Sequence, residues 1–195
     1  MPEQTAAHRH RTNGTIVMDL LAHALWAGAG AGLARRHGKV PKTAVAPIVV
    51  LAVLPDLLQC VPGIIGILTG ATTPDALLAY ARAGPDEQSL LPPTISLFAH
   101  HLHCLMHSIV VAAGVTFVAW LLFRQRAVIL AGWWSHILID VFSHSAEYYA
   151  VPVFYPFTYR GFDGLAWNTP AFFVINYTLL AAVFLWLWLS RQRNQ

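Results

Sequence analysis

Two long stretches of this chain contain almost no charged residues, and they limit the folds that the chain can adopt. Residues 43–74 include one charged side chain, Asp56, and residues 90–123 include none. A helix that crosses a bilayer needs about 20 consecutive, mostly apolar residues. Each stretch is long enough to meet that requirement, and the chain is therefore predicted to be an integral membrane protein.

Polar and proline-rich segments divide the apolar sequence into five predicted membrane helices. Only 11% of the residues are charged, against about 25% in soluble domains. Residues 1–14 are predicted to be a polar tail, and residues 15–191 a single all-α domain, a membrane-embedded helical bundle. The second helix is expected to be interrupted at Pro55-Asp56 and Pro62-Gly63, and a short surface helix is expected at 75–83. The five helices are predicted at 15–36, 43–69, 93–124, from about 126 through 140, and 170–190.

The basic residues predict how the bundle is oriented. An odd number of crossings places the two termini on opposite sides of the membrane. The side of the C-terminus carries eight of the twelve Lys and Arg residues and no acid. Because Lys and Arg favour cytoplasmic loops, the C-terminus is predicted to be cytoplasmic, and the N-terminus and the 148–170 loop external. The net charge of +3 is thereby explained by the orientation of the chain in the membrane. Membrane lipids are the expected partners, and no nucleic-acid partner is predicted. The eight residues are Arg35, Arg36, Lys39, Lys42, Arg124, Arg126, Arg191 and Arg193.

The predicted helices also contain many titratable side chains, which are costly in a membrane and mark bundle interiors or sites. Spacings of three or four residues place several of them on shared helix faces. His136, Asp140 and His144 share one such face, and Glu147 lies close to it if that helix continues so far. With the predicted topology, the set from His23 onward lies at the midplane or in the outer half of the bilayer. The set comprises Asp19, His23, Asp56, His100, His101, His103, His107, His136, Asp140 and His144.

Histidines mixed with carboxylates suit zinc or another borderline divalent metal. The candidate ligands are His23, Asp56, His107, His136 and Asp140, with His103 one turn before His107 as a further candidate. The alternative interpretation is a hydrogen-bonded polar network without metal. Asp19 either belongs to the set or only orients His23, as carboxylates do for metal-bound histidines.

The order and spacing of these residues resemble those of a family of bacterial integral membrane proteins described as metal-dependent hydrolases (YdjM-type). The resemblance covers most of residues 18–177. It implies a location in the bacterial inner membrane and a divalent-metal centre, expected to hold zinc, built from His23, Asp56, His107, His136 and Asp140. The matching segments are Met18–Trp26, Leu54–Asp56, His107-Ser108, Gly132–Asp140, Ser143–Glu147, Phe154–Pro156, Phe162–Gly164 and Trp167.

The helical His-x3-Asp pattern is also similar to that of the all-helical zinc phospholipase C and nuclease group, which implies phosphoester hydrolysis. The leading hypothesis is a membrane-embedded hydrolase of a lipid-borne or amphipathic phosphoester, with the site facing outward. Asp56 or Asp140 are candidates to bridge metals, and Glu147 or His144 to act as the catalytic general base. Arg160 either grips a phosphate or anchors the chain at the interface.

A non-catalytic function is the competing hypothesis: a metal or proton transporter, or a metal-binding membrane protein. A transporter needs polar groups through the full thickness of the membrane, whereas the predicted cytoplasmic halves of these helices are almost wholly apolar. A metal-binding scaffold needs a site saturated by protein ligands, with no open position.

Overall fold

The computed structural model describes residues 15–82, 90–145, 150–167 and 169–192. Every regular element in these ranges is helical, which confirms the all-α class. Helix bounds at 15–36 agree with the sequence-based expectation, and a short helix is present where one was expected in the 70–92 loop. The elements are α1 (Thr15–Arg36), α2 (Lys42–Gln59), α3 (Val61–Leu68), α4 (Pro74–Arg82), α5 (Pro93–Met106), α6 (Ile109–Phe123), a 3-10 helix η1 (Arg124–Leu130), α7 (Ala131–Ser143) and α8 (Pro170–Gln192).

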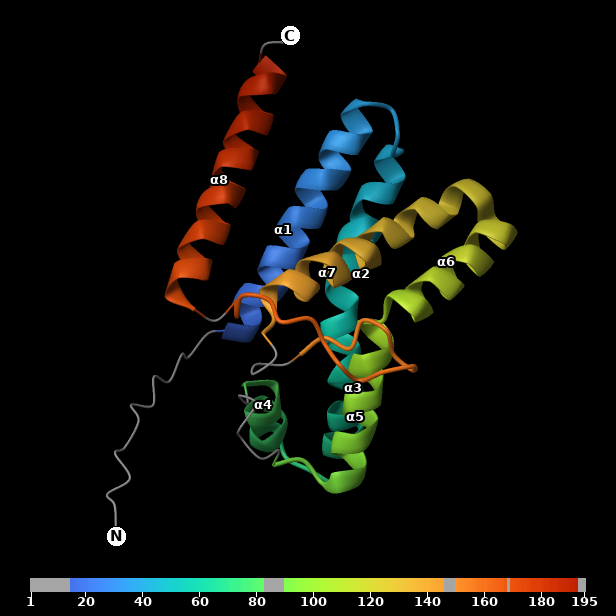
Figure 1. Ribbon diagram of the computed structural model, residues 1–195, viewed down its shortest axis with the longest axis vertical. Coiled ribbons are helices and arrows are strands. Elements are labelled where there is room, and N and C mark those ends of the chain that lie inside the picture. Colours follow the sequence, from blue (N-terminus) through green and yellow to red (C-terminus); the bar gives the residue numbers. More distant parts are fainter. Residues whose placement is uncertain (1–14, 83–89, 146–149, 168, 193–195) are drawn as a thin grey trace.

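Helices α1 and α2 form the centre of the bundle and run antiparallel, with α7 crossing them and α8 standing against α1 (Figure 1). Their contact is lined by small residues, including Ala27, Ala31, Ala44 and Ala52, all of them buried. Small side chains let membrane helices approach closely, so that backbone packing replaces a large apolar core. The outer helix α8 is joined to α1 by a 2.9 Å hydrogen bond from Trp26 Nε1 to Asn176 Oδ1.

Three helical stretches of the described chain are long and apolar enough to cross a membrane: Lys42–Gln59, Ile109–Ser143 and Pro170–Gln192. These lengths indicate a membrane protein. The middle stretch turns back on itself at η1, so that α6 and α7 form a hairpin (Figure 1). With a rise of 1.5 Å per residue, α8 is about 35 Å long, whereas α6 is only about 22 Å and α7 about 20 Å, against a hydrocarbon core of about 30 Å. The predicted number of five crossings is therefore not confirmed.

The structure corrects two predicted helix boundaries. The helix expected over 93–124 is broken at His107-Ser108 into α5 and α6. The helix expected over 43–69 does break, but at Cys60, and Pro55 lies within α2. Pro62 instead occupies the first turn of α3, where a missing backbone N–H leaves no hydrogen bond unmade.

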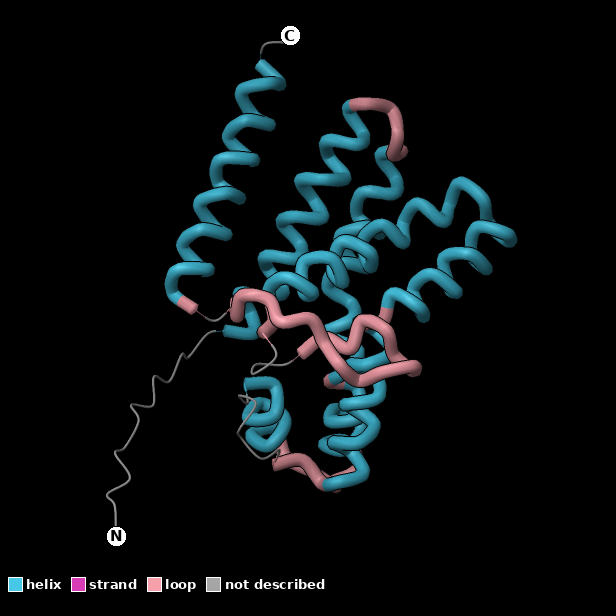
Figure 2. The backbone as a smooth tube through the Cα atoms, in the orientation of Figure 1, coloured by secondary structure: helices cyan, strands magenta, loops and turns pink. Residues whose placement is uncertain are grey.

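A loop over 150–167 closes the end of α7, and in Figure 2 it runs as an irregular segment across the helices. The last carbonyls of a helix lack partners within it. Here the loop supplies them: the N–H groups of Gly164, Leu165 and Trp167 donate to the carbonyls of residues 144, 142 and 143 at 2.7–2.9 Å. Consequently α7 ends at Ser143 and does not continue to residue 147 as the helical spacing suggested.

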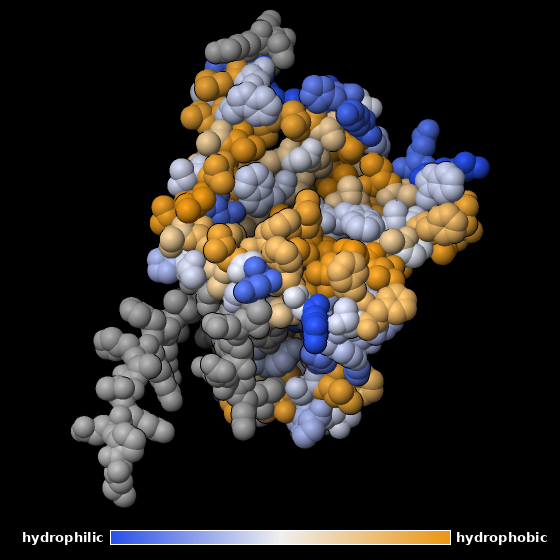
Figure 3. All heavy atoms as spheres, viewed as in Figure 1, coloured by the Kyte–Doolittle hydropathy of each residue, from blue (hydrophilic) through white to orange (hydrophobic). Residues whose placement is uncertain are grey.

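The turn between α1 and α2, the α6–α7 corner and the end of α8 all lie in the upper part of Figure 1. Helix α4 and the start of α5 lie at the opposite end. Of the eight basic residues that the sequence assigned to one side, the seven within the described residues belong to these elements at one end of the molecule. Hydrophilic side chains cover the α1–α2 turn and the α6–α7 corner in Figure 3. We refer to this as the basic end.

Candidate metal centre

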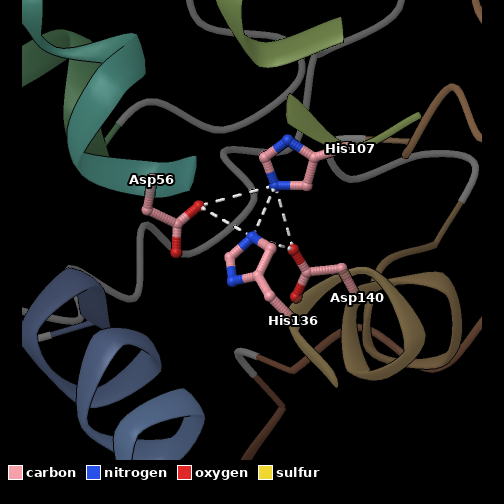
Figure 4. A group of neighbouring side chains, drawn as sticks. All are labelled: Asp56, His107, His136 and Asp140. Atoms are coloured by element: carbon pink, nitrogen blue, oxygen red, sulfur yellow. Dashed lines mark hydrogen bonds and ion pairs between the residues drawn. The ribbon is translucent and has the colours of Figure 1, made fainter. Parts of the chain in front are cut away.

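Close packing of α7 against α2 brings three of the candidate ligands together. Gly132 opens this contact: a Cβ atom there would collide with the backbone of α2 at Ile48. One turn further along α7, His136 faces α2, and Asp140 follows on the same face after another turn. From α2, Asp56 projects toward both of them (Figure 4).

The fourth ligand, His107, sits in the break between α5 and α6. Ser108 creates that break, because its hydroxyl oxygen accepts from the backbone N–H groups of Val110 and Val111 at 3.2 Å and so caps α6. The same hydroxyl donates to the Tyr155 carbonyl at 2.6 Å. A capped break lets His107 leave the helical path and enter the bundle, where its side chain is 1% exposed.

The side-chain atoms of Asp56, His107, His136 and Asp140 converge on one small volume (Figure 4). The Nε2 atoms of the two histidines are 3.0 Å apart, and each lies 3.0 Å from Asp140 Oδ2. Asp56 Oδ1 lies 3.5 Å from His107 Nε2 and 3.7 Å from His136 Nε2. For comparison, two ligands bound tetrahedrally to one zinc at about 2.0–2.1 Å are about 3.3 Å apart. The group has the size of a metal-binding site.

Backbone carbonyls fix which nitrogen of each ring faces the site. His107 Nδ1 is 2.8 Å from the His103 carbonyl oxygen, and His136 Nδ1 is 2.8 Å from the Ala52 carbonyl oxygen. A carbonyl can only accept, so each Nδ1 carries the proton and donates it. In the neutral rings both Nε2 atoms then present lone pairs. This is the arrangement of metal-ligating histidines, whose second nitrogen donates to a carbonyl or carboxylate.

The second oxygen of Asp140 is in contact with two other histidines. Its Oδ1 lies 2.9 Å from His23 Nε2 and 3.8 Å from His144 Nδ1. The ring of His23, which is fully buried, also packs against that of His136 with centroids 4.1 Å apart. The structure thus places His23 beside the four-residue group, in contact with Asp140 and with the His136 ring.

His103 and His144 are buried at the edge of the group. The His103 ring packs on His107 with centroids 4.1 Å apart, and its carbonyl holds the His107 ring in place. His144, in an extended conformation just beyond α7, has Nδ1 3.1 Å from the Asp140 carbonyl oxygen. Burial lowers the pKa of the His144 imidazole, so this ring is neutral at pH 7.

Of the remaining sequence-based candidates, some fall outside the described residues and the others are not among the four grouped side chains. Glu147 is outside the described residues, as is the side chain of Asp19. Arg160 is exposed on the 150–167 loop. His100 contacts Cys104 Sγ at 3.5 Å, and His101 Nδ1 contacts the Tyr155 hydroxyl at 3.4 Å, so both are engaged on the outer face of α5.

Three further residues help to build the site, although their residue types alone did not point to them: Ala52, Ser108 and Gly132. Ser108 carries a signal, since a serine directly before an apolar run is a common helix cap. Gly132 carries a weaker one, as a glycine within a helix often marks close backbone approach. The Ala52 carbonyl carries none, because its role depends on which helix packs beside α2.

The site has one partly open side. The side chains of His107, His136 and Asp140 are at most 1% exposed, whereas that of Asp56 is 15% exposed. Asp56 is therefore the least buried of the four side chains. Comparison with known proteins identifies no relative: no family model, no curated protein and no solved structure matches this chain.

Proposed function

We propose that this protein is a membrane-embedded, metal-dependent hydrolase whose metal is bound by Asp56, His107, His136 and Asp140. One observation carries the proposal. Two imidazole lone pairs and two carboxylates lie within 4.8 Å of one another, and the contacts that involve a histidine are 3.0–3.7 Å long. None of these atoms is a donor when the rings are neutral. A buried set of acceptors repels itself unless a cation is bound among them.

A polar network without metal is the alternative, and it requires a proton in place of the ion. One protonated histidine would donate to Asp140 or to the Nε2 atom of the other ring at 3.0 Å, but the lone pair of the neutral ring would still face Asp140 Oδ2 at 3.0 Å, acceptor against acceptor. A divalent cation interacts favourably with all four groups at once. The N2O2 donor set suits zinc.

A bound divalent metal would supply a Lewis acid and an acidified water molecule. The surrounding residues of the chain have distinct proposed roles in this chemistry. Asp140 is buried and holds its second oxygen against His23, so it serves as a fixed ligand. Asp56 is the least buried member of the set and would receive water or substrate from that side. His144, buried beside Asp140 and neutral, is the proposed general base among the described residues, and Glu147 remains the other candidate.

The proposed substrate is an amphipathic phosphoester. The site lies where α2, α7 and the α5–α6 junction meet (Figure 4). A lipid-borne ester at the membrane surface would place its polar group at this level. With the basic end on the cytoplasmic side of a bacterial inner membrane, the site faces outward.

A metal-binding scaffold is the second candidate, because three of the four ligands are almost fully enclosed. The two functions differ in whether the metal keeps an open position. Hydrolysis assays on purified protein address this directly, with phospholipids and a generic phosphodiester as substrates, each with and without chelator. We expect chelator-sensitive hydrolysis that Asp56→Asn abolishes and that His37→Ala, an exposed histidine at the basic end, leaves unchanged.

Metal bound at full occupancy without hydrolysis of any of these substrates would favour the scaffold. Hydrolysis that persists in chelator and in Asp56→Asn would contradict the proposed mechanism.

A further inference from the structure

A groove of about 1100 Å³ opens at the basic end, between the α1–α2 turn and the α6–α7 hairpin. It arises because α6 diverges from α2 while η1 packs against α2. Its polar lining includes Lys39, Arg124 and Gln125, and its aromatic wall comprises Phe117, Trp120 and Trp134. We call this cavity the basic groove. It shares no residue with the metal centre.

The charge in and around the basic groove has one sign. Lys39 and Arg124 line it, and Arg35, Arg36, Lys42 and Arg126 are near them in sequence. No acidic residue occurs between positions 20 and 55 or between positions 88 and 139, the two parts of the chain that build the groove. The groove therefore attracts an anion, and no acid from these segments competes for it.

Arg124 is fixed at the rim of the groove. Its guanidinium carbon lies 5.3 Å from the centre of the Trp120 ring, a cation–π distance. Its φ of 50° is unusual for a residue with a side chain. A 2.9 Å hydrogen bond from Trp134 Nε1 to Thr116 Oγ1 links α7 to α6 and fixes the second indole in the wall. Cation and aromatic wall thus lie side by side on one surface.

The wall is apolar and open to the surroundings. Phe117 is 60% exposed and Trp120 is 48% exposed, and Val40, Pro41 and Val128 continue the apolar lining. A soluble anion would leave this wall in contact with water. A ligand with an anionic head and long apolar chains covers both parts, and basic pockets between membrane helices are known to suit such lipids.

We propose that the basic groove binds an anionic glycerophospholipid. Its phosphate lies between Lys39 and Arg124, and its acyl chains lie along Phe117 and Trp120. The proposal does not depend on hydrolysis or on a metal, since the groove is built from other residues.

Native mass spectrometry of the delipidated full-length protein tests this with phosphatidylglycerol and phosphatidylcholine offered at equal concentration. We expect phosphatidylglycerol to bind in preference. One cation near a membrane surface contributes about fivefold to binding an anionic lipid. Arg124→Gln alone should therefore lower the affinity about fivefold, and Lys39→Gln with Arg124→Gln about 25-fold. Arg126→Gln also removes one charge from the basic end, but Arg126 does not line the groove, so this variant should have little effect. Arg124→Lys keeps the charge and should retain most of the lipid binding that Arg124→Gln loses.

Equal binding of the two lipids would overturn the proposal, and so would an Arg126→Gln loss as large as that of Arg124→Gln. Inorganic phosphate that displaces the lipid at millimolar concentration would show a simple anion site and would also overturn it. Should the double variant fail to fold, the wild-type preference and the Arg124→Lys and Arg126→Gln variants decide the question by themselves. Unchanged helix content by circular dichroism is the check on folding.

Discussion

The candidate metal centre and the basic groove use polar residues in opposite ways. At the candidate metal centre the ligand atoms of four side chains lie within 4.8 Å of one another, and three of these side chains are almost fully buried. At the basic groove the cations Lys39 and Arg124 are exposed on the rim of an apolar wall. The first region depends on geometry fixed by helix packing, and the second on charge and surface shape. Changes of packing should therefore affect the centre, and changes of charge the groove.

Metal removal should have the largest effect and should act on the centre alone. A ligand present at about 1,000 times its Kd stabilises a protein by about 4 kcal/mol, so chelation should lower the melting temperature of the purified protein strongly. Thermal unfolding in detergent, followed by circular dichroism with and without chelator, measures this. If chelator leaves the melting temperature of the wild type unchanged, no stabilising metal is bound.

Gly132→Ala should have the next largest effect, because the new methyl group collides with the α2 backbone at Ile48. Forcing atoms into a filled contact costs about 1–3 kcal/mol, and moving α7 also separates His136 from Asp56. The matched control is Gly30→Ala in α1, where an added Cβ meets no atom within 4 Å. We expect a lower melting temperature and weaker metal binding for Gly132→Ala only. Equal behaviour of the two variants would show that the α2–α7 contact does not position the site.

His23→Gln should weaken metal binding while leaving the ligand set intact. The Nε2 atom of His23 is 2.9 Å from Asp140 Oδ1, and losing a partner that orients a ligand typically costs 10–100-fold in metal affinity. Competition with a chromogenic chelator gives the affinity, and His37→Ala serves as the control. A loss of far more than 100-fold would make His23 a direct ligand, as the sequence analysis allowed.

Ser108→Ala should have the smallest effect of the four. It removes the α6 cap and the bond to the Tyr155 carbonyl, and loss of a helix cap costs about 1 kcal/mol. The expected results are a slightly lower melting temperature and a small loss of metal affinity through His107. Ser135→Ala is the control, since its hydroxyl bonds only within α7, to the Gly132 carbonyl. A stability loss as large as that of Gly132→Ala would mean that the α5–α6 break, more than the α2–α7 contact, organises the centre.

Much of this centre could be predicted from residue types. Asp56, His107, His136 and Asp140 are exceptional in apolar helices, and the cost of burying them points to a shared site. The structure gathers these four and places His23 next to Asp140. The bounds of α1 were likewise predictable, because an apolar run there begins after a polar tail and ends at two arginines.

Other features depended on contacts between distant segments. The apolar pattern runs through His107 without interruption, so only the Ser108 cap and the Tyr155 carbonyl reveal the break there. The expected extension of α7 toward Glu147 failed because the 150–167 loop binds the last carbonyls of the helix. His103 has suitable spacing for a ligand, but its ring packs on that of His107. Residue spacing along the chain does not predict these contacts between segments that are distant in sequence.

The most direct test of the central claim is X-ray absorption spectroscopy combined with elemental analysis of the purified protein. The wild type should contain a stoichiometric divalent metal with two histidine nitrogens at about 2.0–2.1 Å and carboxylate oxygens at about 2.0–2.2 Å. His136→Ala and Asp140→Ala should lose the metal, and His37→Ala should retain it. Wild-type protein that remains metal-free after incubation with zinc, or metal that is retained in both ligand variants, would contradict the account.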